Sequence, residues 1–437
     1  MTTIWEDYMV TKTLLAGCTA LGALALSTSL ASAVELRFQC YQDGTECQTW
    51  REEIQKFEKQ NPDIKVTVDE VPYKAILESL PVQLAGGDGP DLARVSDLGG
   101  LAKYMLDIRP LIPDADYWEK NYGAELKWTQ VNGKGDNGIY NLPDQLTITG
   151  PFVNKTLFDQ AGVKMPEGKA TWDDWAKASV EVAKKTQTPY PMAIDRSGHR
   201  FAGPAISYGA KYFDKDGNPI TVDESFTNFA KQFVEWNKNG TMDKDVWAGS
   251  GGATYQDASQ QFVNASLVFY MSGSWQVARF GKEIGDAFDW EVVQPPCGPA
   301  ACTGIPGGAS IVGFKHTKHP KEVAKLLDFM AQEDVYADFI GKTKAIPANK
   351  TLQEKGVDYP GATENVKKAL AAFTKAAKNL TPLAFEFQGY KNNRVIMNAT
   401  VTRLTQAIVG ESTLDEALKR IDSDVKEAVK AAGDAKK

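Results

Sequence analysis

Residues 34–71 read VELRFQCYQDGTECQTWREEIQKFEKQNPDIKVTVDEV, and this stretch decides the fold class. Val34–Gln39 alternates apolar and polar residues as a strand does, and Ile64–Val71 alternates again. Between the two strands, three apolar residues recur at helical spacing: Trp50, Ile54 and Phe57. Asn61-Pro62 then ends the helix. Strand, helix and strand in this order predict a βαβ unit of an α/β fold, in which helices cover a sheet.

Two capping boxes predict the starts of further helices downstream. Thr171 with Asp174 precedes a run whose apolar face carries Trp172 and Trp175. Thr413 with Glu416 marks the start of another amphipathic run. Helices therefore continue to alternate with strands well beyond the first unit.

The composition is that of a folded protein, with 437 residues, 43% hydrophobic and 24% charged content and a formal net charge of -7. This length suits about three domains or two large lobes. An acidic chain without a long Lys/Arg run lacks the electrostatic footprint of a protein that binds phosphate backbones. We therefore expect no nucleic-acid partner.

Residues 1–33 resemble a secretory signal peptide. An apolar run, LLAGCTALGALALSTSL at 14–30, follows Lys12 and precedes the small-residue cleavage site Ala31-Ser32-Ala33. We expect cleavage after Ala33 and a periplasmic protein, since no later run is long enough to span a membrane. Cys18 lies in a stretch that resembles a lipoprotein box, but most of the apolar run follows this cysteine, so lipid anchoring is the less favoured alternative.

The other cysteines fall into two close pairs, Cys40 with Cys47 and Cys297 with Cys302. In an exported protein this arrangement predicts two local disulfides. A zinc site is the rival interpretation, but neither pair has CxxC spacing and the pairs are far apart in the sequence. We expect two disulfides, no metal and no cofactor.

Catalytic signatures are incomplete. Gly341-Lys342-Thr343 resembles the end of a P-loop, but Tyr336 stands where the first glycine is needed. Neither GxSxG nor HExxH occurs, and the chain has 3 histidines, too few and too badly spaced for a convincing triad. Paired carboxylates for glycoside hydrolysis are not recognisable from sequence, because their separation is set by the fold. We expect a protein that is not an enzyme, with a secreted carbohydrate-active enzyme as the alternative.

Six short segments together resemble one known family. In chain order they are GGDGPDLA (86–93), LP (142–143), FVNKTLF (152–158), TWDD (171–174), MSGSW (271–275) and GESTLDEAL (410–418). A chain with this series is similar to the family 1 extracellular solute-binding proteins of ABC sugar importers, the relatives of maltose-binding protein. The resemblance covers essentially the whole chain after residue 33.

The resemblance implies a two-lobe periplasmic-binding-protein fold of type II, with the ligand cleft between lobes joined by hinge strands. Lobe one would comprise 34–148 and 309–350, and lobe two 149–308 and 351–437, with crossings near Leu142–Gly150 and Pro306–Ser310. The protein would be a monomer that closes on a mono- or disaccharide, or on an acidic sugar derivative, and delivers it to ABC permease subunits in the inner membrane. The alternative within the same fold is a non-sugar solute such as a glycerol phosphate, a polyamine, a peptide or a metal.

Ligand contacts carry over from the family position by position. They are Tyr41, Gln42, Asp43, Ser96, Asp97, Asp144, Gln145, Thr147, Gly198, His199, Arg200, Trp275, Gly307, Gly308, Tyr390 and Arg394. The resemblance makes Asp97 an acceptor for sugar hydroxyls, with a helix N-cap as the alternative. It makes Trp275 a platform for a sugar ring, with core packing as the alternative. Pro151-Phe152 departs from the family's usual Tyr-Tyr-Asn, which leaves stacking on that side open.

Four arginines fall in or beside these segments: Arg94, Arg200, Arg279 and Arg394. If two or more of them converge, their planar donor forks suit a carboxylate, sulfonate or phosphate, and the ligand would be an acidic sugar derivative. Surface placement of most of the four is the alternative.

Overall fold

The computed structural model describes residues 33–131, 135–215 and 217–434. Its main sheet has eight strands in the order β2-β1-β3-β10-β4-β8-β5, with β9 paired to β4. The strands of this sheet are β1 (Val34–Cys40), β2 (Ile64–Glu70), β3 (Leu92–Val95), β4 (Leu142–Asn154), β5 (Tyr190–Ile194), β8 (Leu267–Gly273), β9 (Trp290–Val292) and β10 (Pro306–Gly313). A separate two-stranded sheet joins β6 (Tyr212–Phe213) to β7 (Pro219–Ile220).

Helices fill the intervals between the strands. In the first part of the chain they are α1 (Glu46–Gln60), α2 (Tyr73–Glu78), α3 (Leu80–Ala85), α4 (Leu98–Leu101), α5 (Ala115–Leu126), α6 (Lys155–Ala161), α7 (Trp172–Thr186), α8 (Gly198–Tyr208), α9 (Glu224–Lys238) and α10 (Lys244–Ala248). Further on they are α11 (Ser259–Val263), α12 (Val277–Glu283), α13 (Pro320–Ala331), α14 (Glu333–Thr343), α15 (Lys350–Lys355), α16 (Glu364–Ala377), α17 (Pro382–Gly389), α18 (Asn393–Val409) and α19 (Leu414–Asp434). Short 3-10 turns are η1 (Ala102–Tyr104), η2 (Arg109–Leu111) and η3 (Ser274–Gln276).

The first βαβ unit forms as the sequence predicts. β1 and β2 are parallel and in register from Val34 opposite Ile64 to Cys40 opposite Glu70. The apolar stripe of α1 is buried, and the ring of Trp50 stacks on Phe339 of α14 with centroids 4.0 Å apart. The backbone N–H of Asn61 donates to the last turn of α1, which ends there. Burial of this stripe therefore fixes the helix against the sheet.

Both capping boxes are present. The Thr171 hydroxyl accepts from the backbone N–H of Asp174, and the Asp174 carboxylate accepts from the backbone N–H of Thr171. Thr413 and Glu416 exchange the same pair of hydrogen bonds at the start of α19. The predicted apolar faces of both helices are buried.

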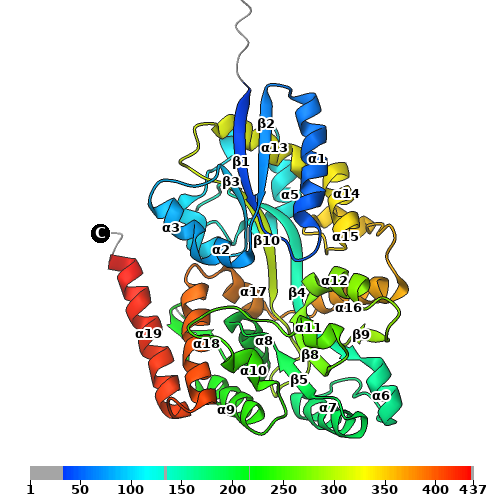
Figure 1. Cartoon of the computed structure of the whole chain (residues 1–437). Coiled ribbons are helices and arrows are strands. Elements are labelled where there is room, and N and C mark those ends of the chain that lie inside the picture. Colours follow the sequence, from blue (N-terminus) through cyan, green and yellow to red (C-terminus); the bar gives the residue numbers. More distant parts are fainter. Residues whose placement is uncertain (1–32, 132–134, 216, 435–437) are drawn as a thin grey trace, which may run out of the picture.

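One strand belongs to both ends of the molecule. β4 pairs with β10 as far as Ile148 and with β8 from Thr149 onward, so its partner changes between these two residues. We call the part built on β1, β2, β3, β10 and the start of β4 the upper lobe, and the part built on the end of β4 with β5, β8 and β9 the lower lobe (Figure 1). The lobe boundaries at 148/149 and near 309 remain a proposal, which the change of partner favours.

The structure forms the two predicted disulfides, Cys40–Cys47 and Cys297–Cys302. The first closes the turn that leads from β1 into α1. None of the described helices is both long and apolar enough to cross a membrane. The predicted signal peptide lies outside the described residues except for Ala33.

Candidate functional site

A cavity of about 460 Å³ lies where the two lobes meet. The upper lobe contributes the turn after β1, helix α2 and the residues that follow β3. The lower lobe contributes the start of α8, the segment before α11, the turn after β8 and the start of α18. The crossing strands β4 and β10 form its floor. Its volume is in the range of small-molecule binding sites.

All of the predicted ligand-contacting residues line this cavity except Asp144 and Tyr390. Those that line it are Tyr41, Gln42, Asp43, Ser96, Asp97, Gln145, Thr147, Gly198, His199, Arg200, Trp275, Gly307, Gly308 and Arg394. Their roles toward a ligand stay predictions. The fold itself brings these residues together from both lobes and from both crossing strands.

Asp144 is a correction, because its side chain points into the protein. It is 0% exposed, and one carboxylate oxygen accepts from Nε of Arg94 at 2.7 Å. Burial opposes the charge on Arg94, but Asp144 together with Tyr41, Glu46 and Asp43 outweighs burial, so the pKa of the guanidinium is raised. Arg94 also donates to the carbonyl of Tyr41 at 3.0 Å and lies 4.3 Å from its ring centroid. The pair supports the β1 turn from beneath instead of contacting a ligand.

Tyr390 is the second correction. Helix α17 ends at Gly389, and the Tyr390 ring lies edge-on to Phe213 with centroids 4.9 Å apart. This contact holds the side chain away from the cavity, whereas Arg394, in the first turn of α18, lines it. Tyr390 and Arg394 are close in the sequence, but the turn between α17 and α18 directs their side chains to different places.

Asp97 combines both roles considered for it. Its carboxylate accepts from the backbone N–H of Gly100 at 3.3 Å and so caps α4, and the residue also lines the cavity. Beside it, the Ser96 hydroxyl is hydrogen-bonded to the Tyr73 hydroxyl at 2.7 Å. Gln42 donates to Glu70 at 2.6 Å, while its Oε1 is buried without a hydrogen-bond partner. Gln42 thus offers an acceptor that the protein leaves unused.

Aromatic rings lie on both walls. Tyr41 and Tyr73 from the upper lobe are 4.7 Å apart between centroids, and Tyr73 meets Tyr255 of the lower lobe edge-on at 6.0 Å. Trp275 is partly buried on η3, so core packing is not its main role. The Arg200 guanidinium carbon lies 4.0 Å from the Trp275 ring centroid, so one face of the indole is covered by a cation.

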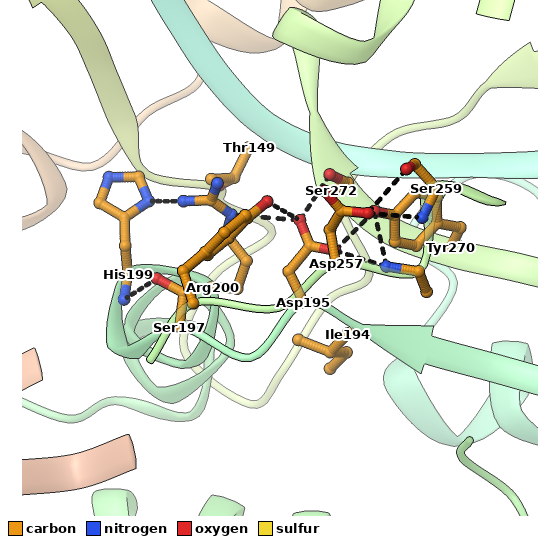
Figure 2. Close-up of polar contacts among 12 residues, drawn as sticks. Thr149, Ile194, Asp195, Ser197, His199, Arg200, Asp257, Ser259, Tyr270 and Ser272 are labelled. Carbon is orange, nitrogen blue, oxygen red and sulfur yellow. Dashed lines mark hydrogen bonds and ion pairs between the residues drawn. The ribbon is translucent and has the colours of Figure 1, made fainter. Parts of the chain in front are cut away.

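His199 is held in one tautomer. Its Nε2–H donates to the carbonyl of Pro306 at 3.0 Å. Its Nδ1 accepts from Arg200 at 3.1 Å (Figure 2). Burial, together with the positive charge of Arg200, lowers the pKa of His199 to about 3. The ring is therefore neutral and ties α8 to the start of β10.

Asp195 anchors Arg200 from the other side. Its oxygens accept from the hydroxyls of Tyr270 at 2.5 Å and Ser272 at 2.6 Å, and Nε of Arg200 lies 3.6 Å away (Figure 2). Burial raises the pKa of Asp195 to about 6. These contacts hold Arg200 in its position over the ring of Trp275.

The lobes also touch each other directly. Arg279 of α12 donates to Ser259 at 2.9 Å and to the carbonyl of Asp43 at 3.4 Å. The Asp43 turn is held by Glu46, whose carboxylate accepts from the backbone N–H groups of Asp43 and Gly44. Burial, together with the nearby Glu46 carboxylate, raises the pKa of Asp43 to about 6.

Glycines allow two close approaches at the site. A side chain on Gly198 would lie 2.3 Å from the backbone of Met397, so the absence of one lets the start of α8 pack on α18. A side chain on Gly308 would lie 2.3 Å from the carbonyl oxygen of Gln145 on the neighbouring strand. The floor of the cavity therefore depends on backbone packing at these positions.

Several lining residues were not predicted, chiefly Tyr73, Tyr255, Asn393, Met397 and Asn398. Tyr255 lies in a polar stretch without a periodic signal, and Tyr73 is the first residue of the short helix α2, which no motif marks. Met397 and Asn398 could have been predicted from Arg394, because residues three and four positions farther along a helix lie on the same face.

The chemistry of the cavity is that of a binding site. Aromatic faces, neutral amides and hydroxyls, and a few charged groups suit a small polar molecule with both apolar and hydrogen-bonding surfaces. Within the described residues, no group of three His, Cys, Asp or Glu side chains is placed to hold a metal ion.

Comparisons with known proteins agree on one family. A family model described as "Bacterial extracellular solute-binding protein" matches residues 42–337. The arabinooligosaccharide-binding protein of Bacillus subtilis is 28% identical over 336 residues, which is 74% of this chain and 73% of that protein. The multiple sugar-binding protein of Streptococcus mutans is 26% identical over 307 residues, 64% of this chain and 67% of that one.

Solved structures share the fold. An ABC substrate-binding protein from Listeria monocytogenes in complex with cycloalternan superposes with a TM-score of 0.76 at 20% identity, covering 91% of this chain and 99% of that chain. Maltose-bound MalE3 of T. maritima gives 0.74 at 18% identity, covering 91% and 100%. These similarities show that the two-lobe α/β architecture is common to all three proteins.

Proposed function

Because the chain belongs to the family of bacterial extracellular solute-binding proteins, we propose that it is the substrate-binding component of an ABC sugar importer. It captures a sugar between its lobes, closes on it and presents the closed form to the permease in the inner membrane. In this role it works in the periplasm and carries out no chemistry on its ligand.

The observation that carries the proposal is the cavity at the junction of the lobes. Its walls come from different lobes, so a ligand that touches both stabilises the closed arrangement over any open one. Tyr41, Tyr73 and Trp275 offer ring faces for the C–H surfaces of a sugar. Gln42, Asp97 and Thr147 offer hydrogen-bonding groups for hydroxyls.

The named relatives support a sugar as the ligand class. Two of them are called arabinooligosaccharide-binding and multiple sugar-binding proteins. Their identity to this chain, 28% and 26%, supports the class of ligand and leaves the particular sugar to experiment.

The test is to incubate the purified protein with a panel of mono- and disaccharides and to measure thermal unfolding and the saccharide itself. A ligand at 100 times its Kd should stabilise the folded state by about 2.7 kcal/mol and raise Tm. Mass spectrometry should recover the saccharide unchanged. A new product would identify a carbohydrate-active enzyme instead, and an unchanged Tm with every sugar would contradict the proposal.

A further inference from the structure

The lower-lobe wall of the cavity carries three guanidinium groups whose charge the protein leaves poorly compensated. We define this arginine wall as Arg196, Arg200 and Arg394, all of which line the cavity. We propose that the ligand is an anionic sugar, whose carboxylate, sulfonate or phosphate is held by Arg200 and Arg394. The inference rests on the proposed function, since it names the class of sugar taken by the same cavity.

Arg394 is the least compensated of the three. It forms no ion pair with any residue that the structure describes, and its Nε is buried without a hydrogen-bond partner. Asp97 and Tyr73 act on it electrostatically, but the Asp97 carboxylate already caps α4. A buried donor without an acceptor is costly, so an acceptor supplied by the ligand would be favourable.

Arg196 adds positive charge behind Arg394. Its guanidinium is fully buried, and its printed partners are all neutral: the carbonyls of Trp247, Gly252 and Thr254 and the hydroxyl of Thr405. Buried charges in proteins are normally paired with an opposite charge. Among the described residues Arg196 has no such partner, so its positive charge acts on the cavity that it lines.

Arg200 has a partner but retains donors. Its side chain is 13% exposed, and its ion pair with Asp195 at 3.6 Å is too long for a hydrogen bond. The Asp195 oxygens are already used by Tyr270 and Ser272. Nη1 donates to His199, while Nε is buried without a hydrogen-bond partner. The guanidinium is therefore held in place, with donors left for a ligand.

Two helix N-termini reinforce the wall. Arg200 and Arg394 lie in the first turns of α8 and α18, which are 11 and 17 residues long and pack together where Gly198 meets Met397. Their partial positive charges add to those of the side chains.

The lining carboxylates favour one orientation of the ligand. Asp43, Glu78 and Asp97 lie on the upper-lobe side. Asp257, on the lower lobe, is 4.0 Å from Arg279 and accepts from Ser259. An anionic group would be repelled by Asp43 and Asp97 and attracted to the arginine wall. The hydroxyls of the same ligand would face the upper lobe.

The test is calorimetric titration with matched pairs of probes at low and high salt: D-glucuronate against D-glucose, D-galacturonate against D-galactose, and glucose 6-phosphate and glucose 6-sulfonate against glucose. We expect the anionic member of a pair to bind at least about 10-fold more tightly, by a margin that shrinks as salt rises. The affinities for the carboxylate, phosphate and sulfonate probes show which of the three anionic groups the cavity prefers.

Arg394→Gln and Arg403→Gln form a matched pair of variants on the same helix. Arg403 pairs with Asp424 and does not line the cavity. Arg394→Gln should weaken anionic binding about 10- to 100-fold and leave the neutral partner nearly unchanged, whereas Arg403→Gln should alter neither.

Neutral sugars that bind as tightly as their anionic partners at every salt concentration would overturn the inference and leave the proposed function intact. A neutral saccharide found bound to the purified protein would do the same. Failure of every probe, charged or neutral, to bind or to raise Tm would count against both.

Discussion

Arg200 covers one face of Trp275, and Gly273 lies close against Cζ3 and Cη2 of the same ring. Residues in this cavity thus act in layers, since Asp195 fixes Arg200 and Arg200 fixes the indole. A substitution at the outermost layer should change binding, whereas one in a deeper layer should change stability as well.

Trp275→Ala should weaken sugar binding by about 1 to 3 kcal/mol, because a ring platform is lost, while Tm changes little. Calorimetric titration and thermal unfolding measure the two effects. Trp247, which is fully buried, provides the comparison: Trp247→Ala should lower the free energy of unfolding by about 3 to 5 kcal/mol. A core-like loss of stability in Trp275→Ala, with normal affinity in the folded fraction, would make Trp275 a structural residue.

Asp144→Asn should lower the free energy of unfolding by about 3 to 5 kcal/mol, because it leaves the buried Arg94 without its counter-charge. Replacing both residues, as Asp144→Leu with Arg94→Met, should cost less than the sum of the single changes. Denaturant titration of the four proteins gives the coupling. Wild-type stability together with lost affinity in Asp144→Asn would restore Asp144 as a ligand contact.

His199 should remain neutral with its proton on Nε2 from pH 8 to pH 4, because its pKa is lowered to about 3. Imidazole ¹⁵N chemical shifts report this directly, and a His199→Gln variant assigns the signal. Unfolded His199 protonates near pH 6.5, so this residue lowers the free energy of unfolding by about 1.4 kcal/mol per pH unit below that value. Stability should therefore fall less steeply with decreasing pH in His199→Gln, and a signal that titrates near pH 6 would contradict the assignment.

At the scale of elements, local sequence patterns predicted the helices and strands but not the side-chain contacts around the cavity. The βαβ unit follows from periodicities within residues 34–71, and each capping box follows from a spacing of three residues. The Arg94–Asp144 pair joins residues 50 apart on β3 and β4, and no local pattern reports which side chains face each other across a sheet. The family resemblance located most of the cavity, but it could not show that Asp144 and Tyr390 point elsewhere.

The Cys40–Cys47 disulfide should matter more for binding than Cys297–Cys302. The first closes the turn that carries Tyr41, Gln42 and Asp43 into the cavity, whereas neither Cys297 nor Cys302 lines it. Each short loop stabilises the fold by roughly 2 to 2.5 kcal/mol in the chain-entropy model.

We expect Cys40→Ser with Cys47→Ser to weaken ligand affinity severalfold and Cys297→Ser with Cys302→Ser to leave affinity near wild type, with similar losses of Tm in both. Titration calorimetry and alkylation followed by intact-mass analysis check binding and redox state. Equal affinities in the two double variants would show that the β1 turn keeps its shape without the bond.

At the scale of the whole molecule, few direct contacts hold the cavity walls together without a ligand. Arg279 reaches the Asp43 carbonyl at 3.4 Å, and Tyr73 meets Tyr255 edge-on. A bound ligand would add contacts to both walls at once. Small-angle X-ray scattering should therefore show a smaller radius of gyration with a binding sugar than without it. An identical radius in both states, at saturating ligand, would exclude closure as the response.

The change of partner along β4 also governs the order in which the chain can fold as it is made. In the upper lobe, the backbones of β3 and β4 do not pair with each other, because β10 lies between them and pairs with both. Residues 306–313 must therefore have left the ribosome before β1, β2 and β3, which were made first, can complete their sheet. Until then β3 lacks its neighbour β10, and the upper-lobe sheet stays incomplete while the whole segment between β3 and β10 is being made.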